Sequence, residues 1–362
     1  MEKYSTIIGM DLGDKTAHWA LMFSDSDEIQ EEGSVRMTAE ALQRKFSQME
    51  SARIAIEVGQ HSRWVSQVLS KCGHEVLVAN ARKVRFIYKN EMKSDRVDAQ
   101  SLARIARLDP QLLSPIQHRS EARQADLARL HARDALVKTR TALVNHVRGV
   151  VKSFGARLPQ CDAETFHKHA PKALPEVLRP ALMPVAEIIG KLCEQIKRYD
   201  KEVLRLCKDS YTETDLFEDV NGAGPLISLA FVLTLESPER FSRGRDVGTF
   251  VGLAPGRDQS GAHDPQLGIT KAGDPFLRRL LVQGAQYILG DLNRQDSELR
   301  QWGLKLAGPP DKDGKYNKRL KKRAVIAVAR KLAILLFTLW RDGTVYDPFY
   351  QKHQREARNE AA

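Results

Sequence analysis

Four acidic residues in the first third of the chain stand where carboxylates can do chemistry. Asp11 ends an apolar run in GMDLG and Glu57 ends a second run in AIEVG, each with a glycine close behind. Asp95 and Asp98 are three residues apart in KSDRVDA, a spacing that places both on one face of a helix start. Strand ends in an α/β sheet are common ligand sites. The local alternatives are a turn role for Asp11, and helix capping and dipole stabilisation for Asp95 and Asp98.

The four carboxylates (Asp11, Glu57, Asp95 and Asp98) predict a divalent metal site if the fold brings them together. Hard oxygen ligands select Mg²⁺, with Mn²⁺ as the alternative ion. Two such ions about 4 Å apart stabilise both the attacking and the leaving oxygen of a phosphoryl transfer. The set therefore predicts metal-assisted chemistry on phosphate esters.

Ser260 is the second chemical candidate, in the segment GLAPGRDQSGAHDPQLGITKAGDPFLRRLL. The segment is too polar for a core and too long for an ordinary turn. A serine beside glycine is usually a loop residue, while an activated serine hydroxyl is a nucleophile, and the residues alone leave both interpretations open. Four nearby basic residues are suited to a phosphate: Arg257, Lys271, Arg278 and Arg279.

The positive charge of the chain is concentrated in two stretches. The 362 residues carry 57 Lys and Arg against 46 Asp and Glu, a net charge of +11 and a pI near 9.4. Residues 119–152 hold eight basic residues and three acids, and residues 315–331 hold eight and no acid. Together they predict surfaces for a nucleic acid, although either alone is compatible with a solvated helix face. The expected contacts are Arg119, Arg123, Arg129, Arg133, Lys138, Arg140, Arg148, Lys318, Arg319, Lys321, Lys322 and Arg323.

Composition and short motifs argue against other classes of protein. Four cysteines at positions 72, 161, 193 and 207 form no CxxC pair, which disfavours a zinc site or a disulfide framework. The longest apolar run, residues 226–235, is too short for a membrane span, and the first residues lack a signal-peptide core. We expect a cytoplasmic protein with reduced cysteines and no membrane partner.

Hydrophobic patterning predicts the elements that would position the candidate residues. Apolar runs indicate strands at 5–13, 18–24, 52–59 and 74–80. A helix at 62–71 lies between the last two, as in one sheet with helical crossovers. A second helix from residue 94 or 95 to Pro110 would carry Asp95 and Asp98 in its first turn.

The remaining chain is predicted to be mainly helical. A long helix covers 120–153, prolines break 155–184 into a linker or short helices, and apolar residues with heptad spacing cover 185–206. That heptad seam either joins two copies of the chain or packs against the 120–153 helix. Gly222 and Gly224 open a further apolar helix, whose first amides either hold a phosphate or simply start the helix. Other helices are predicted at 275–289 and 318–340.

Several motifs together resemble the transposases of the insertion-sequence 110 family. KSDRVDAQSLA is similar to the N-terminal signature of that family. GAGPLISLAFVLTL, FVGLAPGRDQSG and GITKAGDPFLRRLLVQGA resemble its C-terminal domain, in the same order along the chain. The resemblance spans nearly the whole sequence, and its spacing suggests the 1111 subgroup. It implies that the four carboxylates form the DEDD tetrad of the family.

The resemblance also implies a fold of α/β plus α class with four parts. Residues 1–118 would form an RNase H-like domain of the RuvC type, and residues 119–215 a long helix with a coiled-coil segment. Residues 216–345 would form a small, mainly helical transposase domain with the catalytic serine, followed by a tail at 346–362.

The activity implied by the resemblance is DNA strand cleavage and rejoining. Ser260 would attack the scissile phosphate to form a 5′-phosphoserine link, assisted by the tetrad with Mg²⁺. A structured noncoding bridge RNA would pair with donor and target DNA, so that base pairing reads the sequence. The active form would be a homo-oligomer, dimer or tetramer, in a bacterial cytoplasm and associated with the nucleoid when active.

Three other functions compete with this one. A stand-alone RuvC or RNase H-type nuclease or junction resolvase would use the same acids to activate water, but would leave Ser260 and the second domain, about a third of the chain, without a role. An actin-like ATPase or sugar kinase shares GMDLG, but the sequence has no second glycine-rich phosphate loop and no adenosine motif. A non-catalytic nucleic-acid-binding protein would leave the four carboxylates without a purpose.

Overall fold

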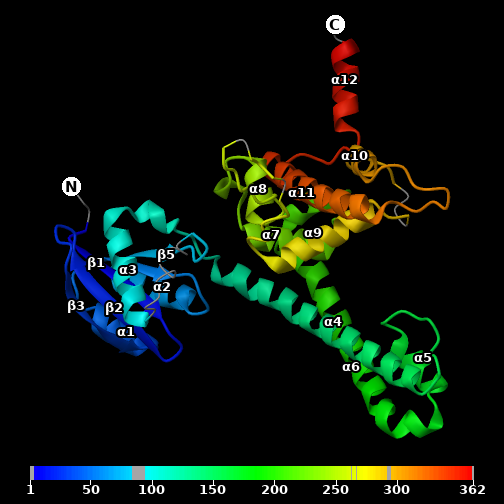
Figure 1. The fold of residues 1–362 in the computed structure, drawn as a ribbon, viewed down its shortest axis with the longest axis horizontal. Helices are drawn as coiled ribbons and strands as arrows, with labels where there is room; N and C mark the ends of the chain where they lie inside the picture. The colour runs from blue at the N-terminus through cyan, green and yellow to red at the C-terminus, as the bar shows by residue number, and fades with distance from the viewer. Residues whose placement is uncertain (1–3, 84–93, 262, 266, 292–294, 361–362) are drawn as a thin grey trace. The chain divides into compact units, whose positions relative to one another are not determined.

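The computed structural model describes residues 4–83, 94–261, 263–265, 267–291 and 295–360. The chain forms two compact units, residues 1–119 and 120–362, and each is described by itself. Figure 1 labels the elements of both units.

The first unit is built on a five-stranded sheet with the order β3-β2-β1-β4-β5. β1 (Thr6–Leu12) pairs antiparallel with β2 (Thr16–Phe23), which pairs antiparallel with β3 (Ile29–Arg36). β1 is parallel to β4 (Arg53–Glu57), which is parallel to β5 (Glu75–Ala79). The four predicted strands are confirmed. The sequence IQEEGSVR did not indicate β3, because an edge strand with mostly solvated side chains lacks apolar alternation.

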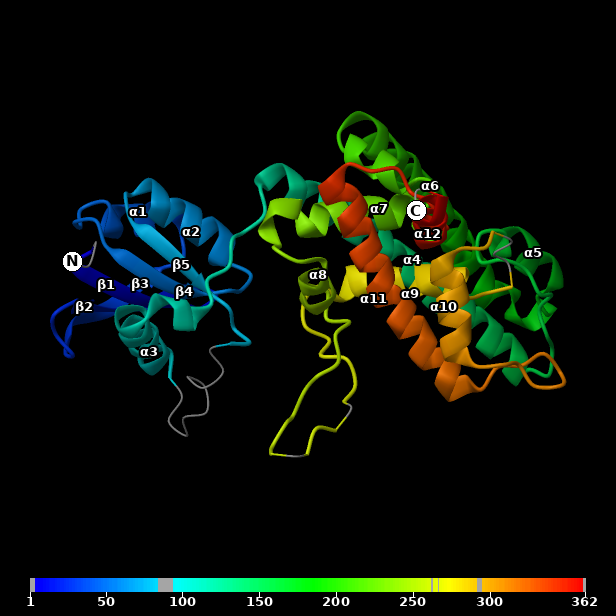
Figure 2. The same cartoon turned by 90° about the horizontal axis from the view of Figure 1, so that it is seen from above.

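Helices cover both faces of the sheet (Figure 2). On one face, α1 (Ala39–Phe46) and α2 (Ser62–Lys71) bury apolar residues of β1 and β4, including Ile8 and Ile54. On the other face, α3 (Asp95–Leu108) packs through small and apolar side chains. A 3-10 turn, η2, follows α3 at Pro110–Leu113. The sheet is therefore the middle layer, with α1 and α2 on one side and α3 on the other, where Leu113 of η2 joins the same buried cluster.

α3 lies directly on β1 because Gly9 has no side chain. A Cβ atom built on Gly9 would lie 2.0 Å from the carbonyl oxygen of Ala99 and 2.3 Å from the backbone nitrogen of Ala103. Both distances are shorter than any van der Waals contact, so a larger residue would push the helix away. The first turn of α3 is thereby held close to the carboxyl end of β1.

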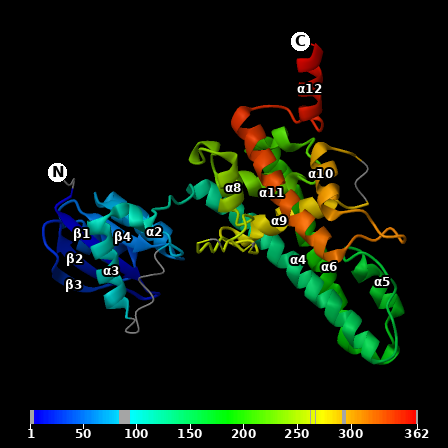
Figure 3. The same ribbon diagram turned by 45° about the horizontal axis from the view of Figure 1, so that its top comes forward.

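The second unit begins with a long helical hairpin. α4 (Glu121–Ser153) packs along α6 (Arg179–Asp209), and α5 (Phe166–Ala173) packs on their far end (Figure 3). Within the predicted heptad seam, Ile189 and Ile196 are buried inside this chain. Of the two alternatives for the seam, the structure contains the intramolecular one. The segment predicted as a linker or short helices holds α5, the turn η3 (Glu176–Leu178) and the first residues of α6.

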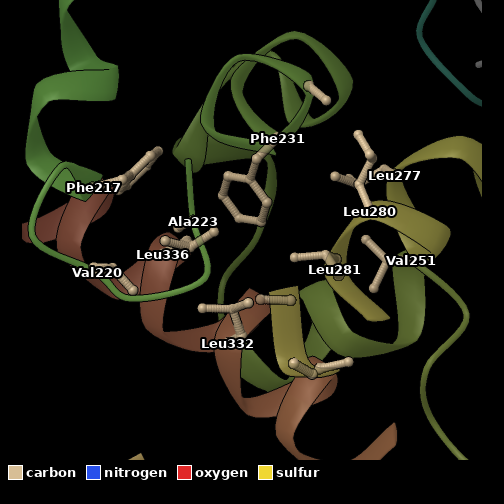
Figure 4. Packing of buried hydrophobic residues seen from close by; sticks show 14 of the residues in the cluster. Phe217, Val220, Ala223, Phe231, Val251, Leu277, Leu280, Leu281, Leu332 and Leu336 are labelled. Atoms are coloured by element: carbon tan, nitrogen blue, oxygen red, sulfur yellow. The ribbon is translucent and has the colours of Figure 1, made fainter. Parts of the chain in front are cut away.

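A helical core follows the hairpin. Its elements are η4 (Thr212–Phe217), α7 (Pro225–Leu235), η5 (Pro238–Arg240), α8 (Gly244–Phe250), α9 (Pro275–Ile288), α10 (Glu298–Ala307), α11 (Lys318–Asp342) and α12 (Tyr350–Glu360). α7 is buried from residue 228 to residue 235, as expected for a helix that is apolar on every side. Figure 4 shows Phe231 of α7 facing leucines of α9 and α11.

The predicted helices at 275–289 and 318–340 are confirmed as α9 and α11. In the part of the chain that the structure describes, no helix is both long and apolar enough to cross a membrane.

Replacement of Gly9 with alanine is expected to destabilise the packing of α3 on β1 by about 3 kcal/mol, because the added methyl group meets backbone atoms that cannot move independently. Hydrogen exchange of the α3 amides, measured by mass spectrometry, should accelerate by about 100-fold. Gly59→Ala is the matched control, since a Cβ atom at Gly59 meets nothing within 4 Å. Unchanged exchange in Gly9→Ala would contradict this account.

Candidate active site

Asp11 and Glu57 lie side by side at the carboxyl ends of two parallel strands. The pairing of β1 with β4 runs up to Met10 and Ile56, and Asp11 and Glu57 are the next residues of the two strands. Successive side chains alternate between the faces of a sheet, so both carboxylates share the α3 face with Ala55. Both side chains are partly buried.

The first turn of α3 brings two further carboxylates toward Asp11. The helix is capped by Ser94, whose hydroxyl oxygen accepts a hydrogen bond from the backbone N–H of Val97. Asp95 is therefore not the capping residue, and that local alternative is wrong. Asp98, one turn along, is buried with 5% of its surface exposed.

The electrostatics of Asp11 show that these carboxylates share one environment. Burial raises the pKa of Asp11 above its ordinary value, and the negative charges of Asp95 and Asp98 raise it further. His18 and a backbone hydrogen bond at Leu12 act in the opposite direction and lower it. The structure thus concentrates negative charge at the end of β1, which is costly unless a cation balances it.

His18 belongs to this site, and the sequence analysis missed it. It is the cross-strand partner of Asp11 in the β1–β2 hairpin, and its Nε2 atom lies 3.9 Å from Oδ2 of Asp95. The signal that indicates it is the hairpin register, since a short turn after β1 places residue 18 opposite residue 11. Its ring provides a partner for two carboxylates of the site.

The donor set at the end of β1 suits a hard divalent cation such as Mg²⁺ or Mn²⁺. The fit rests on the chemistry of these carboxylate oxygens and on the positions of Asp11, Asp95 and Asp98, whose charges influence one another. Within the described ranges, no group of three or more His, Cys, Asp or Glu side chains is already gathered tightly enough to hold an ion. Ion binding would therefore require these side chains to turn toward one another.

Ser260 lies at the tip of a hairpin in the second unit, formed by residues 254–270. Its backbone N–H donates to the carbonyl oxygen of His263 at 3.0 Å, and the N–H of His263 donates to the carbonyl of Ser260 at 3.0 Å. The hairpin extends from the helices between α8 and α9 (Figure 2). Ser260 is exposed, so its hydroxyl is accessible to a large substrate.

The base of this hairpin is anchored tightly, unlike its exposed tip. Gly252 and Gly273 both adopt positive φ values, and a Cβ atom on either would lie within 2 Å of a carbonyl oxygen across the base. Arg278 of α9 donates to the carbonyl oxygens of Val251 at 3.1 Å and Ala272 at 2.9 Å. The predicted phosphate contact Arg278 therefore also joins the two ends of the loop.

Basic side chains of α4 are paired within the second unit. Arg133 contacts Asp200 at 2.6 Å, and Lys138 contacts Asp134 at 2.9 Å. Arg140 is buried with 8% exposed. The other predicted contacts of this stretch also have partners: Arg123 with Glu213 at 3.5 Å, Arg129 with Glu202 at 3.0 Å, and Arg148 with the carbonyl of Pro159 at 3.2 Å. Arg119 lies at the end of the first unit, where its carbonyl oxygen accepts from Arg63.

The basic residues at the start of α11 are mostly exposed to solvent. The α11 basic face consists of Lys318, Arg319, Lys321, Lys322 and Arg323. All are exposed except Lys321, which is partly buried with its Nζ atom 5.0 Å from the centre of the Tyr316 ring. Among ion pairs between described residues, none involves Lys318, Arg319 or Lys322. Lys318, Arg319 and Lys322 of this face, more than the basic residues of α4, present exposed charge to a polyanion.

The remaining residues that were predicted to contact nucleic acid include ion-paired, packed and exposed ones. Arg279 pairs with Asp134 at 2.6 Å, and Arg257 pairs with Asp264 at 3.0 Å. Gly222 is packed against α9, where a Cβ atom would lie 2.6 Å from the carbonyl oxygen of Gly284. Gly224 is the exposed cap residue of α7, and Lys271 is exposed beside the hairpin base.

The chain is similar to known transposases along most of its length. A family model described as "Transposase", of the DEDD type of IS110, matches residues 8–155. A second, described as "Transposase IS116/IS110/IS902 family", matches residues 214–300. The protein belongs to this family of transposases. The two matches include the four carboxylates and the Ser260 hairpin, respectively.

Curated relatives of this transposase cover most of its chain. The transposase for insertion sequence element IS1328 of Yersinia enterocolitica is 26% identical over 357 residues, which are 94% of this chain and 98% of the relative. The transposase for IS1111A of Coxiella burnetii is 28% identical over 260 residues, 70% of this chain and 68% of the relative. A probable family 20 transposase of Pseudomonas aeruginosa is 25% identical over 314 residues, 84% and 88% of the two chains.

Asp11→Asn is expected to stabilise the metal-free transposase at neutral pH. Because the pKa of Asp11 is raised on folding, its charged form costs stability above that pKa, and the cost disappears as the pH falls below the ordinary value of 3.8. The melting temperature of Asp11→Asn should therefore exceed that of the wild type at pH 7, and the difference should shrink toward pH 4.

Divalent ions should reverse the order of the two melting temperatures. At about 100 times its dissociation constant, Mg²⁺ or Mn²⁺ should stabilise the wild type by about 2.7 kcal/mol and Asp11→Asn by much less. Asp25→Asn, at an exposed turn, is the control and should match the wild type throughout. A lower melting temperature for Asp11→Asn at pH 7 would refute the like-charge explanation.

Proposed function

We propose that this transposase cuts and rejoins DNA strands through a serine–phosphate intermediate. The observation that carries the proposal is that Asp11, at the carboxyl end of β1, lies near enough to Asp95 and Asp98 of α3 for their charges to raise its pKa. It is supported by the exposed Ser260 on an anchored hairpin and by the family matches across both segments. Such a reaction conserves the energy of the cleaved phosphodiester bond for rejoining.

Ser260 is the proposed nucleophile. Its Oγ atom attacks the scissile phosphorus, the bond to the 3′ oxygen breaks, and the 5′ end of the DNA stays attached to the serine. In rejoining, a 3′ hydroxyl of the partner strand attacks the phosphoserine and releases Ser260. Because the hydroxyl stands at the exposed tip of the hairpin, a duplex can approach it without rearrangement of the helical core.

The four carboxylates are the proposed ligands of Mg²⁺, with Mn²⁺ as a substitute. When bound, such ions supply positive charge for the non-bridging and leaving oxygens of the phosphate. The carboxylates of Asp11 and Glu57 are held by the sheet, and those of Asp95 and Asp98 by the first turn of α3. His18 orients Asp95 from the neighbouring strand.

We assign the sequence specificity to a structured noncoding guide RNA that pairs with donor and target DNA. This part of the proposal rests on the resemblance to the insertion-sequence 110 family and its 1111 subgroup. The α11 basic face would contact sugar-phosphate backbones, which needs charge and shape but no base readout. We also propose an RNase H-like fold of the RuvC type for residues 1–118, and a homo-oligomer as the active form.

One alternative function is favoured by the location of all four proposed ligands within the first unit. A metal-dependent nuclease or junction resolvase of the RuvC type needs only these acids and an activated water. That function leaves the Ser260 hairpin without a role, and it produces no covalent link between protein and DNA.

A denaturing gel separates the two functions. Purified protein is incubated with Mg²⁺, RNA transcribed from the flanking DNA of its element, and labelled donor and target duplexes. The wild type should yield labelled DNA covalently attached to protein. Ser260→Ala and Asp11→Asn should both abolish the adduct, whereas Ser242→Ala, at an exposed serine of the same unit, should retain it. Free nicked DNA from the wild type and Ser260→Ala alike would establish the nuclease instead.

The α11 basic face should determine how steeply nucleic-acid binding depends on salt. Each phosphate contact contributes about 0.9 to the slope of log K against log salt concentration. Combined replacement of Lys318, Arg319 and Lys322 with alanine should therefore reduce the magnitude of the slope by about 2 to 3. Fluorescence anisotropy with a labelled duplex at several salt concentrations measures it.

A triple replacement of equal charge provides the control for that experiment. Lys191, Lys197 and Lys201 are exposed on α6, and their replacement with alanine should leave the slope unchanged. Equal slopes for the α11 triple variant and the wild type would remove this face from the proposed interface.

A further inference from the structure

The tip of the hairpin places a histidine directly opposite Ser260. The two residues exchange both backbone hydrogen bonds, each 3.0 Å long, and so form a closely paired position of an antiparallel hairpin. Cα atoms in such a pair lie about 5.5 Å apart, and the two side chains leave the same face of the hairpin. The imidazole of His263 and the Ser260 hydroxyl therefore start from neighbouring positions on one face, and rotation of the two side chains can bring them together.

An ion pair lies on the face of the hairpin opposite to Ser260 and His263. Asp264 follows His263 directly, and its carboxylate meets the guanidinium of Arg257 at 3.0 Å. Adjacent residues of an extended chain point to opposite sides, so the Arg257–Asp264 pair lies on the side away from Ser260 and His263. These two charges neutralise each other, and the hydroxyl and the imidazole lie on the remaining face.

We infer that His263 is the general base that activates Ser260, an inference that rests on the proposed serine nucleophile. As the bond from Ser260 Oγ to phosphorus forms and the bond from phosphorus to the 3′ oxygen breaks, the hydroxyl proton moves to a ring nitrogen of His263. The 3′ oxygen takes a proton from water. In rejoining, the attacking 3′ hydroxyl gives its proton back to water as its oxygen bonds to phosphorus. The imidazolium returns its proton to the departing Oγ atom, and the protein ends in its starting state.

A histidine suits this step better than the other groups of the hairpin. A serine hydroxyl is a weak nucleophile until a base removes its proton, and the base must be within hydrogen-bond reach. Imidazole accepts and returns a proton near neutral pH, which a carboxylate does poorly and a guanidinium does not do at all. The exposed position of His263 also allows its proton to exchange with water between turnovers.

The test is the single-turnover rate of covalent adduct formation with the full chain, Mg²⁺, RNA and labelled DNA. His263→Ala should slow adduct formation by about 10² to 10⁴-fold, and added imidazole should restore part of the rate. His263→Gln, which keeps a polar side chain without a proton-accepting ring, should be slow with or without imidazole. His169→Ala, at an exposed histidine of α5, is the control and should react at the wild-type rate.

Two results would overturn the inference. One is a wild-type rate in His263→Ala. The other is a slow His263→Ala variant that imidazole does not restore although it binds the labelled duplex normally, which indicates a structural role for the ring. In both cases an adduct that forms in the wild type and not in Ser260→Ala would leave the proposed serine recombinase standing. Absence of any adduct in the wild type would instead refute the proposed function itself.

Discussion

The contact between α3 and β1 at Gly9 determines where the negative charge of the first unit is concentrated. With no side chain between them, the backbone of α3 at Ala99 and Ala103 rests on the strand. The first turn of the helix therefore lies near the strand end that carries Asp11, and burial and like charge raise the pKa of that carboxyl. The folded protein accepts this repulsion because hydrophobic packing around α3 supplies the stability. A bound cation would turn the same arrangement into a favourable one.

The charged residues of the second unit fall into two groups, those that pair with each other and those that remain exposed. Along α4 and α6, arginines and acids from facing helices pair with each other, as Arg133 and Asp200 do, so much of the positive charge of α4 serves the hairpin. At the start of α11 the basic residues precede the point where the helix enters the core, and their side chains remain in water. Exposed charge of this kind is available for long-range attraction of a polyanion.

The Ser260 hairpin combines a rigid base with an accessible tip. Gly252 and Gly273 allow the two ends of the loop to cross at backbone contact distance, and Arg278 ties both ends to α9. At the tip, Ser260 and His263 are both exposed, so a partner much larger than a pocket ligand could reach them. Functional residues on a loop that a rigid scaffold positions are common in enzymes for this reason.

Local sequence patterns were sufficient to predict most of the strands and helices of this protein, but not the contacts between them. The apolar runs that end at Asp11 and Glu57 determined two strands, and the motif around Asp95 and Asp98 determined a helix start, because these features depend on neighbours in the chain. The edge strand β3, the partner of the heptad seam and the pairing of α4 arginines were decided only by tertiary structure. So were the positions of His18 opposite Asp11 and of His263 opposite Ser260, which depend on strand register. Contacts between residues distant in sequence are set by packing of whole elements, and no local pattern contains that information.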